Sequence, residues 1–296
     1  MVEADKILVV GGGSRIAAAL VPLLGSRAAY AVRRSSGRPR EVVVPNYGAL
    51  PIKVIEGIDR VINCAGISVG DTAQLDRVNA DLPRRIGETA KAAGVRHLIH
   101  VSSFSVYGGA HAIDRATPEA PASDYGRSKQ VGDKALLALA DDRFAVTILR
   151  LPLIYGKNVA GKLAQLLQLW ARVRVLPVPV GDVHRAMIGV DLSAEIIARL
   201  AADPPENSIV FAADPRPFTY ADAARARGEG LHCLPVPRIL ARAIERAVPS
   251  IGGRLFADSR LAEDDNIAIR HDFASRLYRD IAAADLHRFI SPFRKS

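Results

Sequence analysis

A serine, a tyrosine and a lysine are spaced so that they could transfer a proton together. Tyr125 and Lys129 are four residues apart, so a helix that begins after Ser123 or Asp124 would carry both side chains on one face. A free tyrosine has a pKa near 10 and is a poor base at neutral pH, but a neighbouring ammonium lowers that pKa. Ser103 follows an apolar run and could polarise the same substrate oxygen. The three residues predict acid–base chemistry on a hydroxyl or carbonyl group.

The sequence predicts alternating strands and helices that would position these residues. Helical periodicities lie between most of the short apolar runs, which is typical of a parallel, doubly wound sheet. Between the second and third runs, residues 35–40 are too few and too rich in Gly and Pro for a full helix, so one crossover is predicted to be trimmed. The predicted strands are 6–10, 29–33, 41–44, 60–64, 96–101 and 144–149, and the predicted helices are 14–25, 71–93 and 122–141.

A glycine-rich turn follows the first predicted strand. Glycines between a buried strand and a helix let the backbone approach a dinucleotide pyrophosphate, toward which the helix N–H groups point. The usual spacing places glycines at 11, 14 and 17, but Ser14 and Ala17 occupy two of these positions. Ala17 nearly permits the close packing, and the Ser14 hydroxyl could donate to phosphate. A merely tight strand–helix turn is the alternative. The predicted cofactor contacts here are Gly11, Gly13, Ser14, Arg15 and Ile16.

The end of the second strand bears on which dinucleotide would bind. In this arrangement an acidic residue binds the adenosine ribose diol, whereas an arginine accommodates a 2′-phosphate. The chain has Arg33 and Arg34 there, followed by two serines that could add hydrogen bonds, and no acid. NADP is therefore favoured over NAD, although two exposed arginines are also common in a basic protein. The positive charge of an oxidised nicotinamide would further favour the Tyr125 phenolate, so the dinucleotide and the Ser103–Tyr125–Lys129 set support each other.

The regular alternation stops after Gly156. A helical run at 159–173, a Pro-punctuated strand-like stretch at 173–180, a helical run at 191–202 and an Arg-rich end follow. The predicted fold is α/β, a Rossmann-type doubly wound parallel sheet with a smaller C-terminal substrate lobe. Residues 1–156 would form the NAD(P)-binding domain. Residues 157–296 would be mostly substrate lobe, with some segments returning to the main sheet.

Composition narrows the classes of partner. The net charge is +9, but the arginines are scattered and no aromatic-rich basic stretch is present, which favours a solvated surface or an anionic small-molecule substrate over nucleic acid. No apolar run has the roughly 18 residues of a membrane span, and the N-terminus does not resemble a signal peptide. Two cysteines give no disulfide framework, so a cytoplasmic location is expected. The seven histidines show no metal-ligand spacing, so no metal is predicted.

Taken together, these motifs resemble the extended short-chain dehydrogenases/reductases, the group of NAD(P)-dependent sugar-nucleotide epimerases, dehydratases and reductases. The resemblance is strongest from Lys6 to Gly156, fainter to Leu200 and thin beyond. The matching runs are 11–17, 61–66, Val78-Asn79, 101–108, 125–129 and 149–156, with a weaker echo at 185–191.

The resemblance implies a role for each matching residue. Tyr125 would be the acid/base, Lys129 would bind the nicotinamide ribose and lower the tyrosine pKa, and Ser103 would hold the reacting group. Asn79 would support the central helix. The remaining implied contacts are Asn63, Ala65 and Gly66 for the cofactor, and Ser105 and Arg185 for the substrate. The resemblance also implies a homodimer that pairs helices 71–93 and 122–141.

Departures from the family pattern reduce the number of reactions that this chain is expected to catalyse. Dehydratases of this group carry an Asp-Glu pair where this chain has Phe104-Ser105, which cannot supply a general acid and base. Typical epimerases have an asparagine where this chain has Leu153. Together with Arg33 and Arg34, these departures favour NADPH-dependent reduction of a keto-sugar nucleotide over epimerisation by a retained NAD. A non-catalytic NAD(P)-binding sensor or scaffold is the alternative from another class, which the intact Tyr125/Lys129 pair disfavours.

Overall fold

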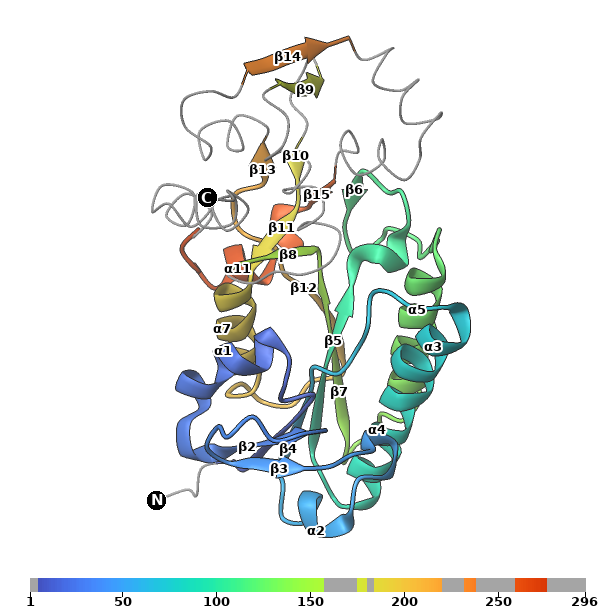
Figure 1. Cartoon of the computed structure of the whole chain (residues 1–296), viewed down its shortest axis with the longest axis vertical. Helices are drawn as coiled ribbons and strands as arrows, with labels where there is room; N and C mark the ends of the chain where they lie inside the picture. The colour runs from blue at the N-terminus through green and yellow to red at the C-terminus, as the bar shows by residue number, and fades with distance from the viewer. Residues whose placement is uncertain (1–4, 157–174, 180–183, 220–231, 238–258, 276–296) are drawn as a thin grey trace, which may run out of the picture. The chain divides into compact units, whose positions relative to one another are not determined.

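A seven-stranded parallel sheet is the centre of the structure, a computed structural model that describes residues 5–156, 175–179, 184–219, 232–237 and 259–275 (Figure 1). The strand order is β12-β7-β5-β4-β1-β2-β3, and every neighbouring pair is parallel. The strands are β1 (Ile7–Val10), β2 (Ala28–Val32), β3 (Glu41–Val43), β4 (Arg60–Asn63), β5 (His97–Ser103), β7 (Ala145–Leu151) and β12 (Ser208–Phe211). This confirms the predicted doubly wound sheet.

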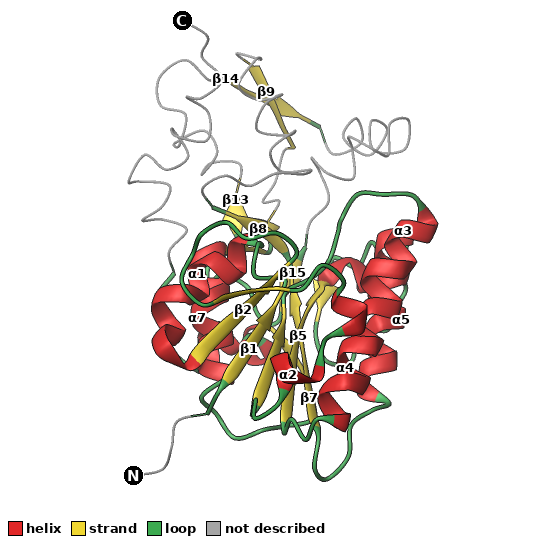
Figure 2. Cartoon of the chain, turned by 60° about the horizontal axis from the view of Figure 1, so that its bottom comes forward, coloured by secondary structure: helices red, strands yellow, loops and turns green. Residues whose placement is uncertain are grey.

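Helices cover both faces of this sheet (Figure 2). Helices α1 (Arg15–Leu24) and α7 (Val190–Leu200) pack together on one face, and α3, α4 and α5 lie on the other. The second group comprises α3 (Thr72–Asp76), a π-helical turn (Arg77–Asp81), α4 (Leu82–Ala92) and α5 (Asp124–Leu137). The predicted helix 71–93 therefore contains a π-helical turn. Residues 33–40 between β2 and β3 form no helix, as predicted.

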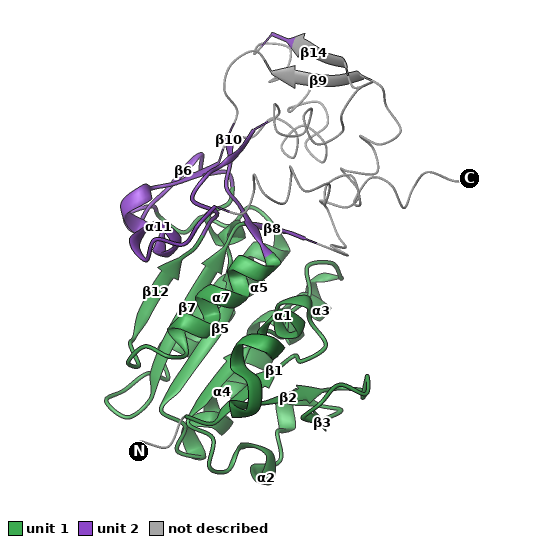
Figure 3. Cartoon of the chain, turned by 90° about the vertical axis from the view of Figure 1, so that its left-hand side faces the viewer, with its two compact units in different colours: residues 1–108, 118–152, 190–212 green, residues 109–117, 153–189, 213–296 purple. Residues whose placement is uncertain are grey.

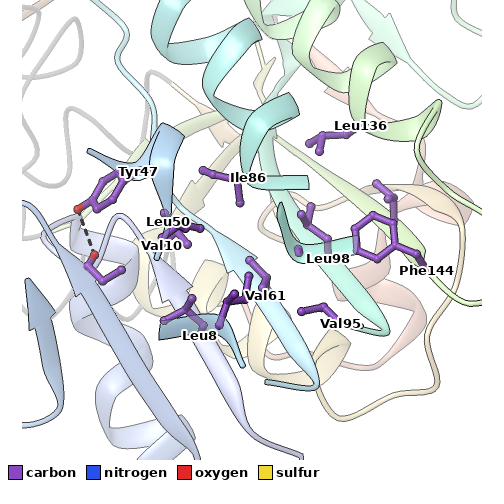
Figure 4. Close-up of a cluster of buried hydrophobic side chains, with 14 of the residues drawn as sticks. Leu8, Val10, Tyr47, Leu50, Val61, Ile86, Val95, Leu98, Leu136 and Phe144 are labelled. Atoms are coloured by element: carbon purple, nitrogen blue, oxygen red, sulfur yellow. Dashed lines mark hydrogen bonds between the residues drawn. The ribbon is translucent and has the colours of Figure 1, made fainter. Parts of the chain in front are cut away.

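The apolar runs become central strands because both faces of the sheet are covered. All four residues of β1 are fully buried, the pattern of a parallel strand between two helical layers. A continuous core cluster joins the sheet to α4 and α5, and the Tyr47 hydroxyl at its edge donates to the carbonyl oxygen of Ala31 at 3.1 Å (Figure 4). Residues of this cluster include Leu8, Val61, Ile86, Leu98, Leu136 and Phe144.

Contacts divide the chain into two compact units (Figure 3). The first comprises residues 1–108, 118–152 and 190–212, so α7 and β12 lie beyond residue 156 in sequence but belong to the unit of the main sheet. The second comprises residues 109–117, 153–189 and 213–296. The predicted helix 159–173 lies outside the described residues, whereas the strand-like stretch contains β9 and the run 191–202 matches α7.

The second unit contains short strand pairs. Strand β8 (Leu153–Tyr155) pairs with β11 (Met187–Gly189), β6 (Ala112–Ile113) with β15 (Arg260–Leu261), and β9 (Val175–Pro179) with β14 (His232–Val236), all in parallel. Strand β10 (His184–Arg185) pairs antiparallel with β13 (Phe218–Thr219). The short helix α11 (Ile267–Arg270) also belongs here. In the described part of the chain no helix is long and apolar enough to cross a membrane.

The described residues also contain short helical turns. They are the 3₁₀ turns Gly25–Arg27, Tyr47–Ala49, Phe104–Tyr107 and Glu263–Asp265, and the one-turn α-helix α2 (Ile52–Ile55).

Candidate active site

The sheet order places a candidate dinucleotide site between β1 and β4. Strands β2 and β3 continue from β1 in one direction, and β4, β5 and β7 continue in the other, so the order reverses at this point. Ligands of doubly wound sheets bind outside the carboxyl ends of the strands where such a reversal occurs. The glycine turn follows β1 and Ala65 follows β4, so both predicted cofactor segments meet at this reversal.

The glycine turn fits a dinucleotide pyrophosphate. Gly11 has φ +80°, and a Cβ there would lie 2.6 Å from the backbone nitrogen of Ala65, so only glycine suits both its conformation and its space. A Cβ on Gly13, by contrast, would meet no atom within 4 Å, so this backbone is open to an approaching phosphate. The N–H groups at the start of α1 follow directly, which is the arrangement that binds phosphate in this fold.

The first turn of α1 is capped by the residue that breaks the glycine spacing. The Ser14 hydroxyl accepts a hydrogen bond from the backbone N–H of Ala17 at 3.2 Å. This bond occupies an oxygen lone pair, and the hydroxyl proton is still able to donate to a phosphate. Ile16 is buried and Arg15 is half-buried, so Ile16 could contact a phosphate only through its backbone N–H.

The turn that follows β4, at Ala65 and Gly66, is called the β4 turn. A buried side-chain amide holds it in place. Asn63 is fully buried, and its Oδ1 accepts from the backbone N–H of Ala65 at 3.0 Å. Its Nδ2 donates to Nδ1 of His100 at 3.1 Å. The side chain of Asn63 is therefore placed to shape the turn at Ala65 and Gly66, and not to face a cofactor itself.

Ser103 and Tyr125 come together because α5 begins against the turn that follows β5. The Ser103 hydroxyl accepts from the backbone N–H of Ser105 and lies 3.1 Å from the Ser105 hydroxyl. A Cβ on Gly126 would collide with the carbonyl oxygen of Ser105, so glycine allows this close approach. Ser123 caps α5 by accepting from the Gly126 N–H at 3.1 Å, so the helix begins at Asp124, one residue before Tyr125.

The acidity of Tyr125 differs from the sequence-based expectation. Burial raises the pKa of Tyr125, the Ser103 hydroxyl opposes this through a hydrogen bond, and the Asp133 carboxylate adds to the rise. The Lys129 ammonium, expected to lower this pKa, is not among the causes. In the protein alone, desolvation outweighs attraction, and the phenol form of Tyr125 is favoured at neutral pH.

Lys129 lies next to the β4 turn and is almost fully buried. Its Nζ donates to the carbonyl oxygen of Val101 at 2.8 Å. A Cβ on Gly66 would lie 3.9 Å from this Nζ, so the lysine reaches the predicted cofactor turn. Burial lowers the pKa of Lys129 to about 8, although the Asp133 carboxylate opposes the shift. The amine is thus positioned between the cofactor turn and the helix that carries Tyr125.

Two buried groups behind Lys129 were not assigned a role from the sequence. His100 has Nε2 3.3 Å from Lys129 Nζ and 3.9 Å from Oδ1 of Asp133. Asp133 is fully buried, and its Oδ2 accepts from Ser102 at 2.8 Å and from Arg150 at 3.1 Å. Asp133 follows Lys129 by one helical turn, and that spacing is the signal that could have identified it.

Asn79 connects the cofactor side to the central helix. Its side chain donates to the carbonyl oxygen of Ile67 at 2.9 Å and to the Ser128 hydroxyl at 3.1 Å, and it accepts from the Ile67 N–H at 3.0 Å. Asn79 lies in the π-helical turn, a feature often found at functional sites. These bonds fix α5 against the loop that follows β4, which agrees with the supporting role expected for this residue.

The loop after β2 carries the candidate ribose and phosphate contacts. Arg33 and Arg34 are exposed, and neither side chain forms an ion pair or hydrogen bond with the described residues. Ser35 and Ser36, by contrast, donate to the carboxylate of Glu41, the first residue of β3. Arg185 belongs to the second unit, so its predicted contact with substrate stays a prediction, as does the predicted homodimer.

Comparison with known proteins assigns the sequence to a family. Residues 7–209 match the model of the NAD dependent epimerase/dehydratase family. A probable dTDP-4,6-dihydroxy-2-methyloxan-3-one 4-ketoreductase of Streptomyces antibioticus is 28% identical over 172 residues, which cover 56% of this chain and 57% of that protein. A ceramide reductase of Caulobacter vibrioides is 33% identical over 196 residues, which cover 59% of this chain and 57% of that protein. The chain thus spans little more than half the length of these relatives.

Solved structures share the fold across nearly the whole chain. MoeE5 in complex with UDP-glucuronic acid and NAD has a TM-score of 0.72 and 20% identity, over 96% of this chain and 99% of that one. The human epimerase family protein SDR39U1 with NADPH has a TM-score of 0.69 and 17% identity, over 96% and 99%. The family match covers more than half of the sequence, and the chain belongs to the NAD-dependent epimerase/dehydratase family of extended short-chain dehydrogenases/reductases.

Proposed function

We propose that this protein is an NADPH-dependent reductase that converts the keto group of a sugar nucleotide into a hydroxyl. The observation that carries the proposal is the pairing of Ser103 with Tyr125 at the start of α5, the helix whose Lys129 reaches Gly66 in the turn after β4. The reductase among the matched relatives that acts on a dTDP-linked ketone supports the substrate class.

Each residue of the site has a role in this reaction. A bound reduced nicotinamide supplies the hydride to the carbonyl carbon. The Ser103 hydroxyl donates a hydrogen bond to the carbonyl oxygen, which polarises the bond and stabilises the negative charge that develops there. The Tyr125 hydroxyl gives its proton to the same oxygen, so the product is a neutral alcohol. Lys129 would hold the ribose near the cofactor turn, and its ammonium would bring a positive charge to the face of α5 on which the Tyr125 phenolate forms.

The exposed pair Arg33 and Arg34 supports NADPH as the reductant. Both guanidinium groups follow β2, where the substituent on the adenosine 2′ position is read in this fold. A guanidinium binds phosphate through several N–H donors, and these two side chains have no competing partner among the described residues.

An NAD-dependent epimerase is the second candidate. The observation that favours it is the engagement of Ser35 and Ser36 by Glu41, because a fixed carboxylate near the adenosine ribose opposes a 2′-phosphate. An epimerase would retain NAD through the cycle, whereas a reductase releases its oxidised cofactor in every turnover.

The test combines cofactor binding with turnover. The purified protein is first examined for bound cofactor, then titrated with NADP⁺ and NAD⁺ by calorimetry, and finally assayed for NADPH oxidation with dTDP- and UDP-linked 4-keto sugars. The proposal expects exchangeable NADP⁺ and oxidation of NADPH by at least one keto-sugar nucleotide. Tightly retained NAD⁺ with epimerisation and no NADPH oxidation would contradict it.

A matched pair of variants tests whether Arg33 and Arg34 bind the 2′-phosphate of NADPH. Replacing both Arg33 and Arg34 by Ala is expected to weaken NADP⁺ binding roughly tenfold or more while NAD⁺ binding changes little, because the lost ion pairs involve the 2′-phosphate alone. The control is Arg143→Ala, an exposed arginine just before β7, toward the other edge of the sheet. Equal losses for both cofactors would remove the argument for NADPH.

A further inference from the structure

The loop between β2 and β3 folds around a carboxylate. The Ser35 hydroxyl donates to Oε2 of Glu41 at 2.9 Å, the Ser36 backbone N–H donates to the same oxygen at 2.7 Å, and the Ser36 hydroxyl donates to Oε1 at 2.6 Å. Arg38 donates from Nε to the Ser36 hydroxyl at 2.9 Å, and the same Nε lies 3.6 Å from Oε1. Two hydroxyls, one N–H and one guanidinium therefore surround one anionic side chain.

This carboxylate is ionised and well enclosed. The Glu41 side chain is only 5% exposed, and its backbone lies in register with Tyr30 of β2. The Ser36 hydrogen bond is the largest influence on its acidity and, with Ser35 and Arg38, lowers the pKa of Glu41 to about 2. A full negative charge is thus held beside β2 throughout the physiological pH range.

The donors that hold Glu41 are of the kind that hold a phosphate. Serine hydroxyls, backbone N–H groups and arginine are common ligands of phosphate oxygens. These donors follow β2, where proteins of this fold bind the substituent at the 2′ position of the adenosine ribose. The serines that the sequence suggested for a 2′-phosphate are therefore already occupied by an anion of the chain itself.

We propose that Glu41 sets the cofactor preference of this site by competing with the 2′-phosphate for Ser35 and Ser36. A 2′-phosphate can gain these donors only by displacing the carboxylate, and otherwise it binds close to a fixed like charge. The free 2′-hydroxyl of NAD carries no charge and meets neither penalty. Arg33 and Arg34 attract the phosphate while Glu41 opposes it, so the balance of these groups decides between the two cofactors. The proposal rests on the cofactor site and does not depend on the reductase reaction.

The test measures binding of the adenosine end alone. 2′,5′-ADP and 5′-AMP differ by the 2′-phosphate, and the ratio of their dissociation constants reports how the site discriminates. In Glu41→Gln, the affinity for 2′,5′-ADP relative to 5′-AMP is expected to rise roughly tenfold, the effect of removing one charge a few ångströms away at a protein surface. NADP⁺ relative to NAD⁺ should shift in the same direction. Glutamine keeps the length of the side chain, and Glu41→Ala is the second variant.

A matched control separates this local effect from a change in overall charge. Glu56→Gln removes the same charge from an exposed residue after α2, and it should leave the ratio unchanged. A ratio that is unchanged or lower in both Glu41 variants, with the thermal midpoint retained, would overturn the proposal. The proposal would also be overturned if the wild-type chain bound neither 2′,5′-ADP nor 5′-AMP. Failure of the reductase proposal is distinguishable, because it would appear as absent turnover while these binding ratios still shift.

Discussion

The Lys129 Nζ lies 3.3 Å from Nε2 of His100, and both side chains are buried between β5 and α5. The Asn63 amide donates to the other ring nitrogen, so a neutral His100 carries its proton on Nε2. That nitrogen lies beside the Lys129 amine and 3.9 Å from Oδ1 of Asp133, an oxygen with no hydrogen-bond partner in the part of the chain that the structure describes. The Lys129 amine is thus backed by a buried imidazole and not by solvent.

The rate of reduction should depend on the charge of Lys129. Burial lowers the pKa of Lys129 to about 8, so its ammonium loses the proton as the pH rises through about 8. Above this pH the phenolate left on Tyr125 loses one of its two expected cations and keeps only the oxidised nicotinamide, so turnover falls. A profile of kcat against pH checks this expectation. A flat profile from pH 7 to 10 would contradict it.

Removing the His100 ring should shift that profile. In His100→Phe the Nε2–H that faces the Lys129 ammonium as a second donor is removed, so the ammonium is favoured and the alkaline limb of kcat moves to higher pH. The matched control is His97→Phe, because His97 is also buried on β5 but hydrogen-bonds Arg60 and Thr147 instead. Both variants should lose about 1–3 kcal/mol of unfolding free energy through unpaired polar groups. An equal shift of the limb in both would show that stability alone is responsible.

Gly126 should matter for turnover more than for cofactor binding. In Gly126→Ala the new Cβ would collide with the Ser105 carbonyl, so α5 must move away from the turn that holds Ser103. A displacement near 1 Å can reduce kcat by roughly a hundredfold. The dissociation constant of 5′-AMP should stay nearly constant, since the glycine turn is not involved. Gly109→Ala, where a Cβ meets no atom within 4 Å, is the control and should keep wild-type kcat.

The buried ion pair of Asp133 and Arg150 should contribute to stability. Asp133→Asn leaves the Arg150 guanidinium with Glu119 and Tyr107 but without its fully buried carboxylate partner. Breaking such a pair typically costs about 3 kcal/mol or more of unfolding free energy. Urea denaturation measures this loss. Glu88→Gln, which breaks the exposed pair with Arg84, should change stability by less than about 1 kcal/mol.

Much of the fold could be predicted because its information is local. Runs such as Ile7–Val10 are apolar at every position, since strands covered on both faces have no solvent side, and the glycine turn follows directly. The Tyr125/Lys129 spacing likewise needs only one helix. The trimmed crossover between β2 and β3 was evident from its length and its Gly and Pro content.

Other features depend on packing between distant segments and were not predictable in this way. His100 and Lys129 meet only because α5 lies against β5, and nothing near His100 in the sequence indicates a lysine partner. Glu41 is the first residue of a strand, and its contacts with Ser35 and Ser36 form because the loop before it folds back onto it. In the protein without cofactor, burial raises the pKa of Tyr125, and helix spacing could not reveal this because it shows the neighbouring lysine but not the desolvation.

The central claim is that Tyr125 donates the proton that completes hydride transfer. The most direct measurement is single-turnover NADPH oxidation by the Tyr125→Phe variant, with the keto-sugar nucleotide that the wild-type chain reduces and with NADP⁺ affinity determined in parallel. The account predicts that oxidation is lost by a factor of roughly a thousand or more while NADP⁺ binds as in the wild type. A variant that keeps the wild-type rate would contradict the assignment of Tyr125 as the acid.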